Sequence, residues 1–144
     1  MFSKNIKILL VDDDTVFRQM LKDMFRRIGN CKVITVKGAN MGNWFAQCPW
    51  HKPDIILLDV RMPNIDGLEL LKILKQDPKT QDIPVIMVTA VADEEIKLKA
   101  RKLGCADYIV KPVTISDLEV RINRVIEMKP YKDNSSIRSD EKLN

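Results

Sequence analysis

Five residues with useful chemistry lie at the ends of short apolar runs. They are Asp12, Asp13, Asp59, Thr89 and Lys111. Clustered carboxylates repel one another and favour a bound cation, and Mg²⁺ is typically held by one or two carboxylates together with waters. A carboxylate can also attack phosphorus to give an aspartyl-phosphate, while an ammonium and a hydroxyl spread the charge of the transferred group. These residue types therefore indicate phosphoryl transfer to a carboxylate beside Mg²⁺.

The apolar runs that precede these residues are predicted to be strands. A run of four such as Ile55–Leu58 is too short for a helix and is typical of a strand buried on both faces of a parallel sheet. Five such runs occur, at residues 6–11, 32–36, 54–58, 83–88 and 108–110. They alternate with helical patterns, which predicts an α/β three-layer sandwich with right-handed crossovers. We expect five parallel strands in the flavodoxin-like order 2-1-3-4-5, with five flanking helices.

Caps mark most of the predicted helices. Asp14 is expected to cap the first helix rather than to bind the metal, and Gly29 is expected to end that helix. The third, fourth and fifth helices are expected to begin at Asp66–Gly67, Asp93 and Thr114. Residues 38–51 contain glycine, proline and two tryptophans, so the second helix is expected to be short or distorted. Trp44 and Phe45 in that segment are interpreted as core residues, with a surface patch left open.

The predicted strand order brings the polar residues to one edge of the sheet. The first and third strands become neighbours, and their carboxyl ends flank the topological switch point where such sheets bind ligands. We therefore expect Asp12 and Asp13 to lie beside Asp59, with Thr89 and Lys111 at the same edge. Each residue alone has an ordinary structural explanation, but the convergence favours Asp59 as a nucleophile.

This combination resembles the receiver domain of two-component response regulators. The residues that carry the resemblance are Asp12–Asp13, Asp59, Met62–Pro63, Asp66–Gly67, Thr89–Ala90 and Lys111–Pro112. The resemblance covers roughly residues 5–128, which we take as a receiver domain of residues 1–128 followed by a polar tail or linker, 129–144. It implies that Asp59 accepts a phosphoryl group from a sensor histidine kinase or a histidine phosphotransfer protein. Such a domain is a phosphoacceptor that promotes its own phosphorylation and slow dephosphorylation, not a turnover enzyme.

The resemblance also implies roles for neighbouring residues. Mg²⁺ would be held by Asp13, Asp59 and the backbone carbonyl of Arg61, with Asp12 acting through a water. Thr89 would move toward the phosphate and Tyr108 would turn inward, changing the face formed by the fourth helix, fifth strand and fifth helix. Family members often pair through that face when phosphorylated, and the phosphodonor usually docks near the first helix. The Lys111–Pro112 bond is typically cis in the family.

Two other interpretations stay open. Residues 11–16 also match the strand-then-DxDx(T/V) signature of haloacid-dehalogenase phosphatases, in which Asp12 would be the nucleophile and Asp14 the acid. Against it, no acidic pair follows Lys111, no cap domain is evident, and Asp59 would have no role. The second alternative is a binding module that is never phosphorylated, although such a module would not require the complete set of site residues.

Composition bounds the remaining possibilities. The chain is 45% hydrophobic and 31% charged, with no apolar stretch of membrane-span length and no signal peptide pattern, so we expect a cytoplasmic protein. A net charge of +4 is concentrated around the first helix and second strand without a recognition-helix pattern, so no direct nucleic-acid binding by this domain is expected. Three cysteines without metal or redox spacing are expected to be reduced, and His51 is expected to be solvated. The sequence does not indicate the output partner or domain.

Overall fold

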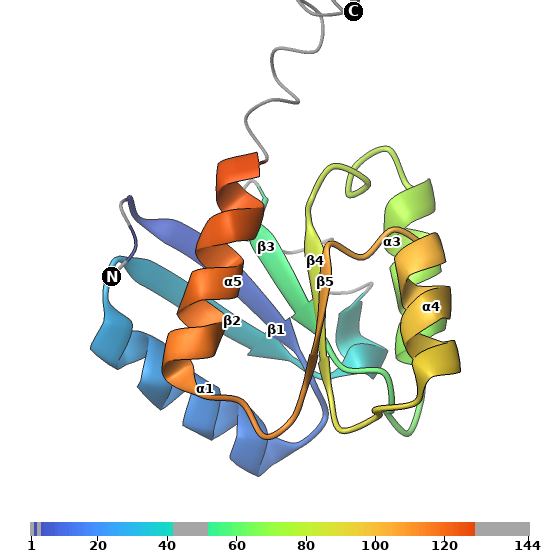
Figure 1. Ribbon diagram of the computed structural model, residues 1–144, viewed down its shortest axis with the longest axis horizontal. Helices are drawn as coiled ribbons and strands as arrows, with labels where there is room; N and C mark the ends of the chain where they lie inside the picture. The colour runs from blue at the N-terminus through green and yellow to red at the C-terminus, as the bar shows by residue number, and fades with distance from the viewer. Residues whose placement is uncertain (1, 3, 42–51, 129–144) are drawn as a thin grey trace, which may run out of the picture.

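Strands and helices alternate along the chain as the apolar periodicity predicts. The structure is a computed structural model, and it describes residues 2, 4–41 and 52–128. Its strands are β1 (Ile6–Val11), β2 (Cys31–Val36), β3 (Ile55–Leu58), β4 (Val85–Thr89) and β5 (Asp107–Val110). All neighbouring pairs are parallel and the order is β2-β1-β3-β4-β5, which confirms the predicted topology (Figure 1).

Four α-helices flank the sheet within the described residues, where five were expected. They are α1 (Thr15–Ile28), α3 (Gly67–Gln76), α4 (Glu94–Lys102) and α5 (Ile115–Met128), and a short 3₁₀ helix, η1 (Gly38–Asn40), follows β2. Most of the predicted second helix falls in residues 42–51, which lie outside the described part of the chain together with Trp44, Phe45 and His51. The tail at 129–144 lies outside it as well.

Alternate residues of the strands face two separate cores. Helices α1 and α5 cover one face of the sheet, where Phe17, Leu21 and Leu118 pack with Ile8 and Leu57. Helices α3 and α4 cover the other face. The core there contains the strand residues that alternate with the first set, together with the leucines of α3: Leu9, Val11, Ile56, Leu58, Leu70, Leu71 and Leu74. Figure 1 shows the two helix pairs on opposite sides of the strands. A sheet covered on both faces explains why β3 is apolar at every position, and the predicted three-layer sandwich is confirmed.

Helix caps form where the sequence places them. The carboxylates of Asp14, Asp66 and Asp93 accept backbone N–H groups at the starts of α1, α3 and α4. Gly29 ends α1 with φ 79°, a conformation that favours glycine. Strand β4 begins at Val85 rather than at Ile83 as predicted, because Pro84 has no N–H to contribute to the ladder.

No helix among the described residues is long and apolar enough to span a bilayer. Of the three cysteines, Cys31 and Cys105 lie in the described part of the chain, where both are free thiols with pKa values raised by burial. The expectation of reduced cysteines is therefore confirmed for these two.

Candidate functional site

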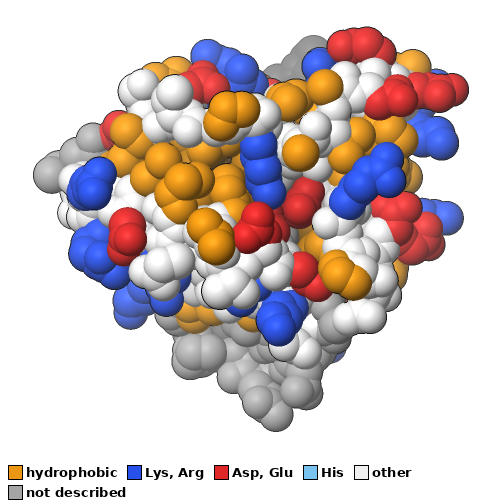
Figure 2. All heavy atoms as spheres, turned by 90° about the horizontal axis from the view of Figure 1, so that it is seen from below, with side chains coloured by type: hydrophobic (Ala, Val, Ile, Leu, Met, Phe, Trp, Pro, Cys, Tyr) orange, Lys and Arg blue, Asp and Glu red, His pale blue; other side chains and the backbone are white. Residues whose placement is uncertain are grey.

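Lys111 joins two carboxylates at the carboxyl edge of the sheet. Its Nζ donates to Asp12 Oδ2 at 2.9 Å and lies 3.7 Å from Asp59 Oδ2. Strands β1 and β3 are paired as far as Val11 and Leu58, so the next residues, Asp12 and Asp59, leave the sheet side by side. Figure 2 shows this face, with acidic side chains gathered around a basic one near its centre. The predicted convergence of Asp12, Asp59 and Lys111 is present in the structure.

Both carboxylate oxygens of Asp12 accept a hydrogen bond. Oδ2 accepts from Lys111, Oδ1 accepts the N–H of Asp14 at 2.8 Å, and the side chain is only 1% exposed. Burial raises the pKa of Asp12, the two hydrogen bonds oppose that rise, and the charge of Asp59 adds to it. A buried carboxylate with both oxygens engaged is a poor nucleophile. This geometry counts against the phosphatase alternative, which needs Asp12 to attack.

Asp59 makes only long contacts with the described residues. Its Oδ1 accepts the N–H of Arg61 at 3.4 Å, and its Oδ2 lies 3.7 Å from Lys111 Nζ. Asp59 is 9% exposed where Asp12 is 1% exposed, so it is the more accessible of the two in a mostly buried site. Of the two carboxylates that face Lys111, Asp59 is therefore the better placed to attack an incoming group.

The loop after β3 is held against Asp59 by Gly67. The N–H of Gly67 donates to the carbonyl of Val60 at 2.7 Å, and an isolated bridge pairs Arg61 with Asp66. A Cβ placed on Gly67 would lie 1.9 Å from the carbonyl oxygen of Asp59. Only glycine allows the start of α3 to approach the backbone of Asp59 so closely.

Asp13 lies beside Asp12 but its carboxylate is bonded elsewhere. Its Oδ1 accepts the N–H of Gly38 at 2.8 Å, which ties the loop after β2 to the site. A Cβ on Gly38 would lie within 3 Å of Ile65 and Met62, so this glycine fits between Asp13 and the loop after β3. The structure therefore places Asp13 at the edge of the site without a direct contact to Lys111.

The donor set fits a hard divalent cation in its chemistry. Within the described residues, no group of three or more His, Cys, Asp or Glu side chains is arranged to hold a metal. Mg²⁺ does not require such a group, because it takes one or two carboxylates and keeps several waters. Asp59 has only long contacts and Asp13 uses one oxygen for Gly38, so both have carboxylate oxygen lone pairs to offer. Carboxylate and carbonyl oxygens are the donors that this ion prefers.

Thr89 and Tyr108 are both bonded to Val91. Thr89 is 1% exposed, and its Oγ1 accepts the N–H of Val91 at 3.3 Å. The hydroxyl of Tyr108 donates to the carbonyl of Val91 at 2.7 Å, and the residue is buried, which raises the pKa of its phenol. A single loop residue therefore connects the hydroxyl at the end of β4 with the aromatic ring of β5. The inward turn of Tyr108 on phosphorylation stays a prediction.

Three residues have a place in the site that their sequence patterns did not indicate. Phe17 has the spacing of a core residue, yet Lys111 Nζ lies 3.9 Å from the centroid of its ring. Arg18 belongs to the basic stretch, and its guanidinium donates to the carbonyl of Asp12 at 2.7 Å. Gly38 lies in the irregular segment after β2. The contacts of Phe17 with Lys111 and of Gly38 with Asp13 join parts of the chain that only the folded sheet brings together, whereas the Arg18 bond is local to the start of α1. The Lys111–Pro112 bond is cis, as the resemblance implied.

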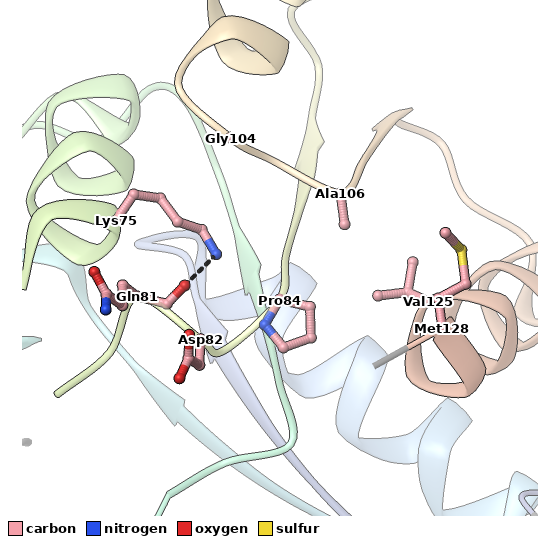
Figure 3. Close-up of a pocket in the computed structure, with 8 residues that line it drawn as sticks. All are labelled: Lys75, Gln81, Asp82, Pro84, Gly104, Ala106, Val125 and Met128. Atoms are coloured by element: carbon pink, nitrogen blue, oxygen red, sulfur yellow. Dashed lines mark hydrogen bonds between the residues drawn. The ribbon is translucent and has the colours of Figure 1, made fainter. Parts of the chain in front are cut away.

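A separate hollow lies at the opposite edge of the sheet. It has a volume of about 300 Å³ and is lined in part by Lys75, Pro84, Ala106 and Met128 (Figure 3). Pro84 and Ala106 precede β4 and β5, so this hollow is at the amino ends of the strands. In Figure 3 the ammonium of Lys75 bonds the carbonyl of Gln81. None of the predicted site residues lines this hollow.

Comparisons with known proteins agree on one family. The sequence model of the response regulator receiver domain matches residues 8–123. The chain is 37% identical over 120 residues to the phosphate regulon transcriptional regulatory protein PhoB of Pseudomonas aeruginosa, covering 83% of this chain and 51% of PhoB. It is 31% identical over 137 residues to the cyclic di-GMP phosphodiesterase response regulator RpfG of Xanthomonas campestris, covering 93% and 35%. The chain thus spans about half or less of the length of these relatives.

Solved structures show the same fold. A CheY-like response regulator receiver domain protein from Methanospirillum hungatei superposes with a TM-score of 0.75 at 28% identity, covering 88% of this chain and 98% of that one. The Mn²⁺-bound form of the response regulator Rcp1 superposes with a TM-score of 0.68 at 25% identity, covering 83% and 91%.

Proposed function

Because this chain belongs to the response regulator receiver domain family, we propose that it is a phosphorylation-dependent signalling switch in which Asp59 accepts the phosphoryl group. The contact of the Lys111 ammonium with both Asp12 and Asp59 carries this proposal. Asp12 is fixed by short hydrogen bonds, whereas Asp59 combines a nearby cation with oxygens that make only long contacts with the described residues. Asp59 would thereby act as the phosphoryl acceptor, and Asp12 would hold the ammonium of Lys111.

The proposed reaction transfers a phosphoryl group from a phosphohistidine. One carboxylate oxygen of Asp59 attacks phosphorus in line with the phosphorus–nitrogen bond, and the electron pair of that bond returns to the imidazole nitrogen. The ammonium of Lys111 and the hydroxyl of Thr89 would bond the oxygens of the transferred group and spread its charge. The donor would be a sensor histidine kinase or a histidine phosphotransfer protein.

Mg²⁺ is the cofactor that this site would use. Receiver domains bind Mg²⁺ generally, and the solved structure of Rcp1 contains Mn²⁺, which has similar ligand preferences. In this chain, Asp13, Asp59 and the backbone carbonyl of Arg61 would hold the ion directly, and Asp12 would act through a water. The bound ion would offset the repulsion between the carboxylates and the incoming phosphoryl group. Asp14 is committed as the cap of α1 and would take no part.

Thr89 and Tyr108 would carry the signal away from Asp59. A move of the Thr89 hydroxyl toward a phosphoryl group would break its bond with Val91, whose carbonyl also holds Tyr108. The surface formed by α4, β5 and α5 would change as a result, for a downstream partner or a second copy of the domain. The relatives carry different outputs by name, a transcriptional regulator and a phosphodiesterase, so the output of the whole protein is left open.

Mapping the phosphorylated residue tests this proposal. The protein would be incubated with acetyl phosphate and Mg²⁺, and the acyl phosphate would be trapped with borohydride and located by mass spectrometry. We expect the label at Asp59 and no label in Asp59→Asn. Asp66→Asn is the matched control, since it changes an exposed carboxylate that caps α3 and asparagine caps equally well. A label at Asp12 would support the phosphatase alternative and overturn the assignment.

A further inference from the structure

The ammonium of Lys111 lies against the face of an aromatic ring. Its Nζ is 3.9 Å from the centroid of the Phe17 ring. We infer that Phe17 is a positioning residue for phosphoryl transfer, whose ring face holds the Lys111 ammonium where it faces Asp59. The inference rests on the proposed function of Asp59, and it assigns a role to a residue whose spacing indicated only the core.

The geometry favours a real attraction between ring and ammonium. Cation–π contacts act within about 6 Å of the ring centroid and strengthen as the partners leave water. The Lys111 side chain is 18% exposed and Phe17 is 6% exposed, so the contact is largely shielded from water. The ammonium is thus bounded by Asp12 at 2.9 Å, by Asp59 at 3.7 Å and by the ring.

A continuous series of contacts links the backbone N–H of Phe17, through Asp14, Asp12 and Lys111, back to the Phe17 ring. Asp14, the cap of α1, accepts the N–H of Phe17 at 3.2 Å, and its own N–H donates to Asp12 at 2.8 Å. Asp12 in turn accepts from Lys111, which lies on the Phe17 ring. The first turn of α1 therefore cannot shift without moving both the ring and the carboxylate that hold the ammonium. This series of contacts gives the side chain of Lys111 a defined position before any phosphoryl group arrives.

An aromatic ring suits this position better than another carboxylate. A third carboxylate would hold the ammonium more strongly, but it would also neutralise the charge that must attract the phosphoryl oxygens. The ring attracts the ammonium through its negative face and carries no net charge. Lys111 therefore keeps its positive charge available while its position is restrained.

Replacing Phe17 with fluorinated phenylalanines separates this role from simple packing. One, two or three fluorines weaken the negative face of the ring step by step and nearly preserve its shape. The rate of phosphorylation by acetyl phosphate with Mg²⁺ would be measured for each protein. We expect the rate to fall with each added fluorine. The total decrease in the rate should be about three- to tenfold. The same series at Phe25, which is 1% exposed in the same helix and core, is the matched control and should leave the rate unchanged.

A second readout checks the contact without using the reaction. Protons on the terminal carbon of Lys111 should resonate upfield of those of other lysines, because the nitrogen bonded to that carbon lies 3.9 Å from the ring centroid. Lys111→Arg would assign the signal, and Phe17→Leu should move it to the ordinary position. An ordinary proton chemical shift for Lys111 in the unaltered protein would overturn the inference. A phosphorylation rate that does not change with fluorination of Phe17 would overturn it as well. Either result would leave Asp59 as the acceptor. Absence of phosphorylation in the unaltered protein would overturn the proposed function and this inference together.

Discussion

Gly67→Ala provides a sharp test of how the site holds its nucleophile. The added Cβ would lie 1.9 Å from the carbonyl oxygen of Asp59 and 2.7 Å from the Cα of Val60. Ordinary contact begins at 3.4 Å, so the two backbone segments must separate by about 1.5 Å. The obstructing atoms belong to the backbone and cannot rotate away as a flexible side chain would. The displacement therefore falls on Asp59 itself.

Two measurements should change together. Overpacking of this kind costs about 1–3 kcal/mol of the free energy of unfolding, which a urea titration would measure. A displacement of about 1 Å at a reacting group costs on the order of 100-fold in rate. We therefore expect Gly67→Ala to be folded but phosphorylated by acetyl phosphate about 100 times more slowly than the unaltered protein.

Gly104→Ala is the matched control. Gly104 has φ 105°, so an alanine there is strained by about 1–3 kcal/mol, while its Cβ would meet only the flexible side chain of Lys75. This residue lines the hollow at the far edge of the sheet, away from Asp59. The control should lose stability and keep its phosphorylation rate. If Gly67→Ala reacted at the unaltered rate, or if both variants slowed equally, the argument from backbone displacement would be refuted.

Three further substitutions test the surroundings of the site. Burial raises the pKa of Asp12, so folding favours its protonated form, and that stabilisation is lost as pH rises through the raised pKa. Asp12→Asn removes the buried charge and should therefore be more stable than the unaltered protein at neutral pH without metal. Urea titrations should show this difference shrinking as pH falls through the raised pKa of Asp12 and reaching its minimum at about pH 4, the ordinary value for an aspartate in an unfolded chain. Tyr108→Phe removes the hydrogen bond to Val91 and should cost about 1 kcal/mol of unfolding free energy in the same assay. Arg61→Ala removes an exposed guanidinium from a residue two positions after the acceptor, and it should shorten the phosphate lifetime by up to about fivefold; an unchanged lifetime would contradict this role.

The sheet and the meeting of its polar residues could be predicted because both follow from local pattern. Runs such as Ile55–Leu58 are typical of strands buried on both faces of a parallel sheet, and five of them with intervening helices leave few topologies. The order then places the ends of β1 and β3 side by side, which brings Asp12 to Asp59. The caps at Asp14 and Asp66 are equally local, since each carboxylate bonds N–H groups two or three residues ahead.

The remaining contacts depend on how separate segments pack. Phe17 has core spacing, and nothing near it in sequence indicates that the lysine directly after β5 lies on its ring. The need for glycine at position 67 comes from the approach of α3 to the backbone of Asp59. A side chain at position 38 would require Ile65 and Met62 to move, because the loop after β2 meets the loop after β3 there. These close approaches depend on how whole helices, strands and loops pack together. Hydrophobic periodicity along the sequence carries no information about that packing.

Asp12 and Asp59 show how one residue type acquires two functions from its surroundings. A carboxylate with short hydrogen bonds on both oxygens has little capacity left to attack, and burial further disfavours its charge. Asp12 meets both conditions, and in doing so it holds the ammonium of Lys111 in place. Asp59 receives the field of that ammonium at 3.7 Å without a short bond to it. Its reactivity therefore depends on Lys111 being bound more tightly by its neighbours than by Asp59 itself.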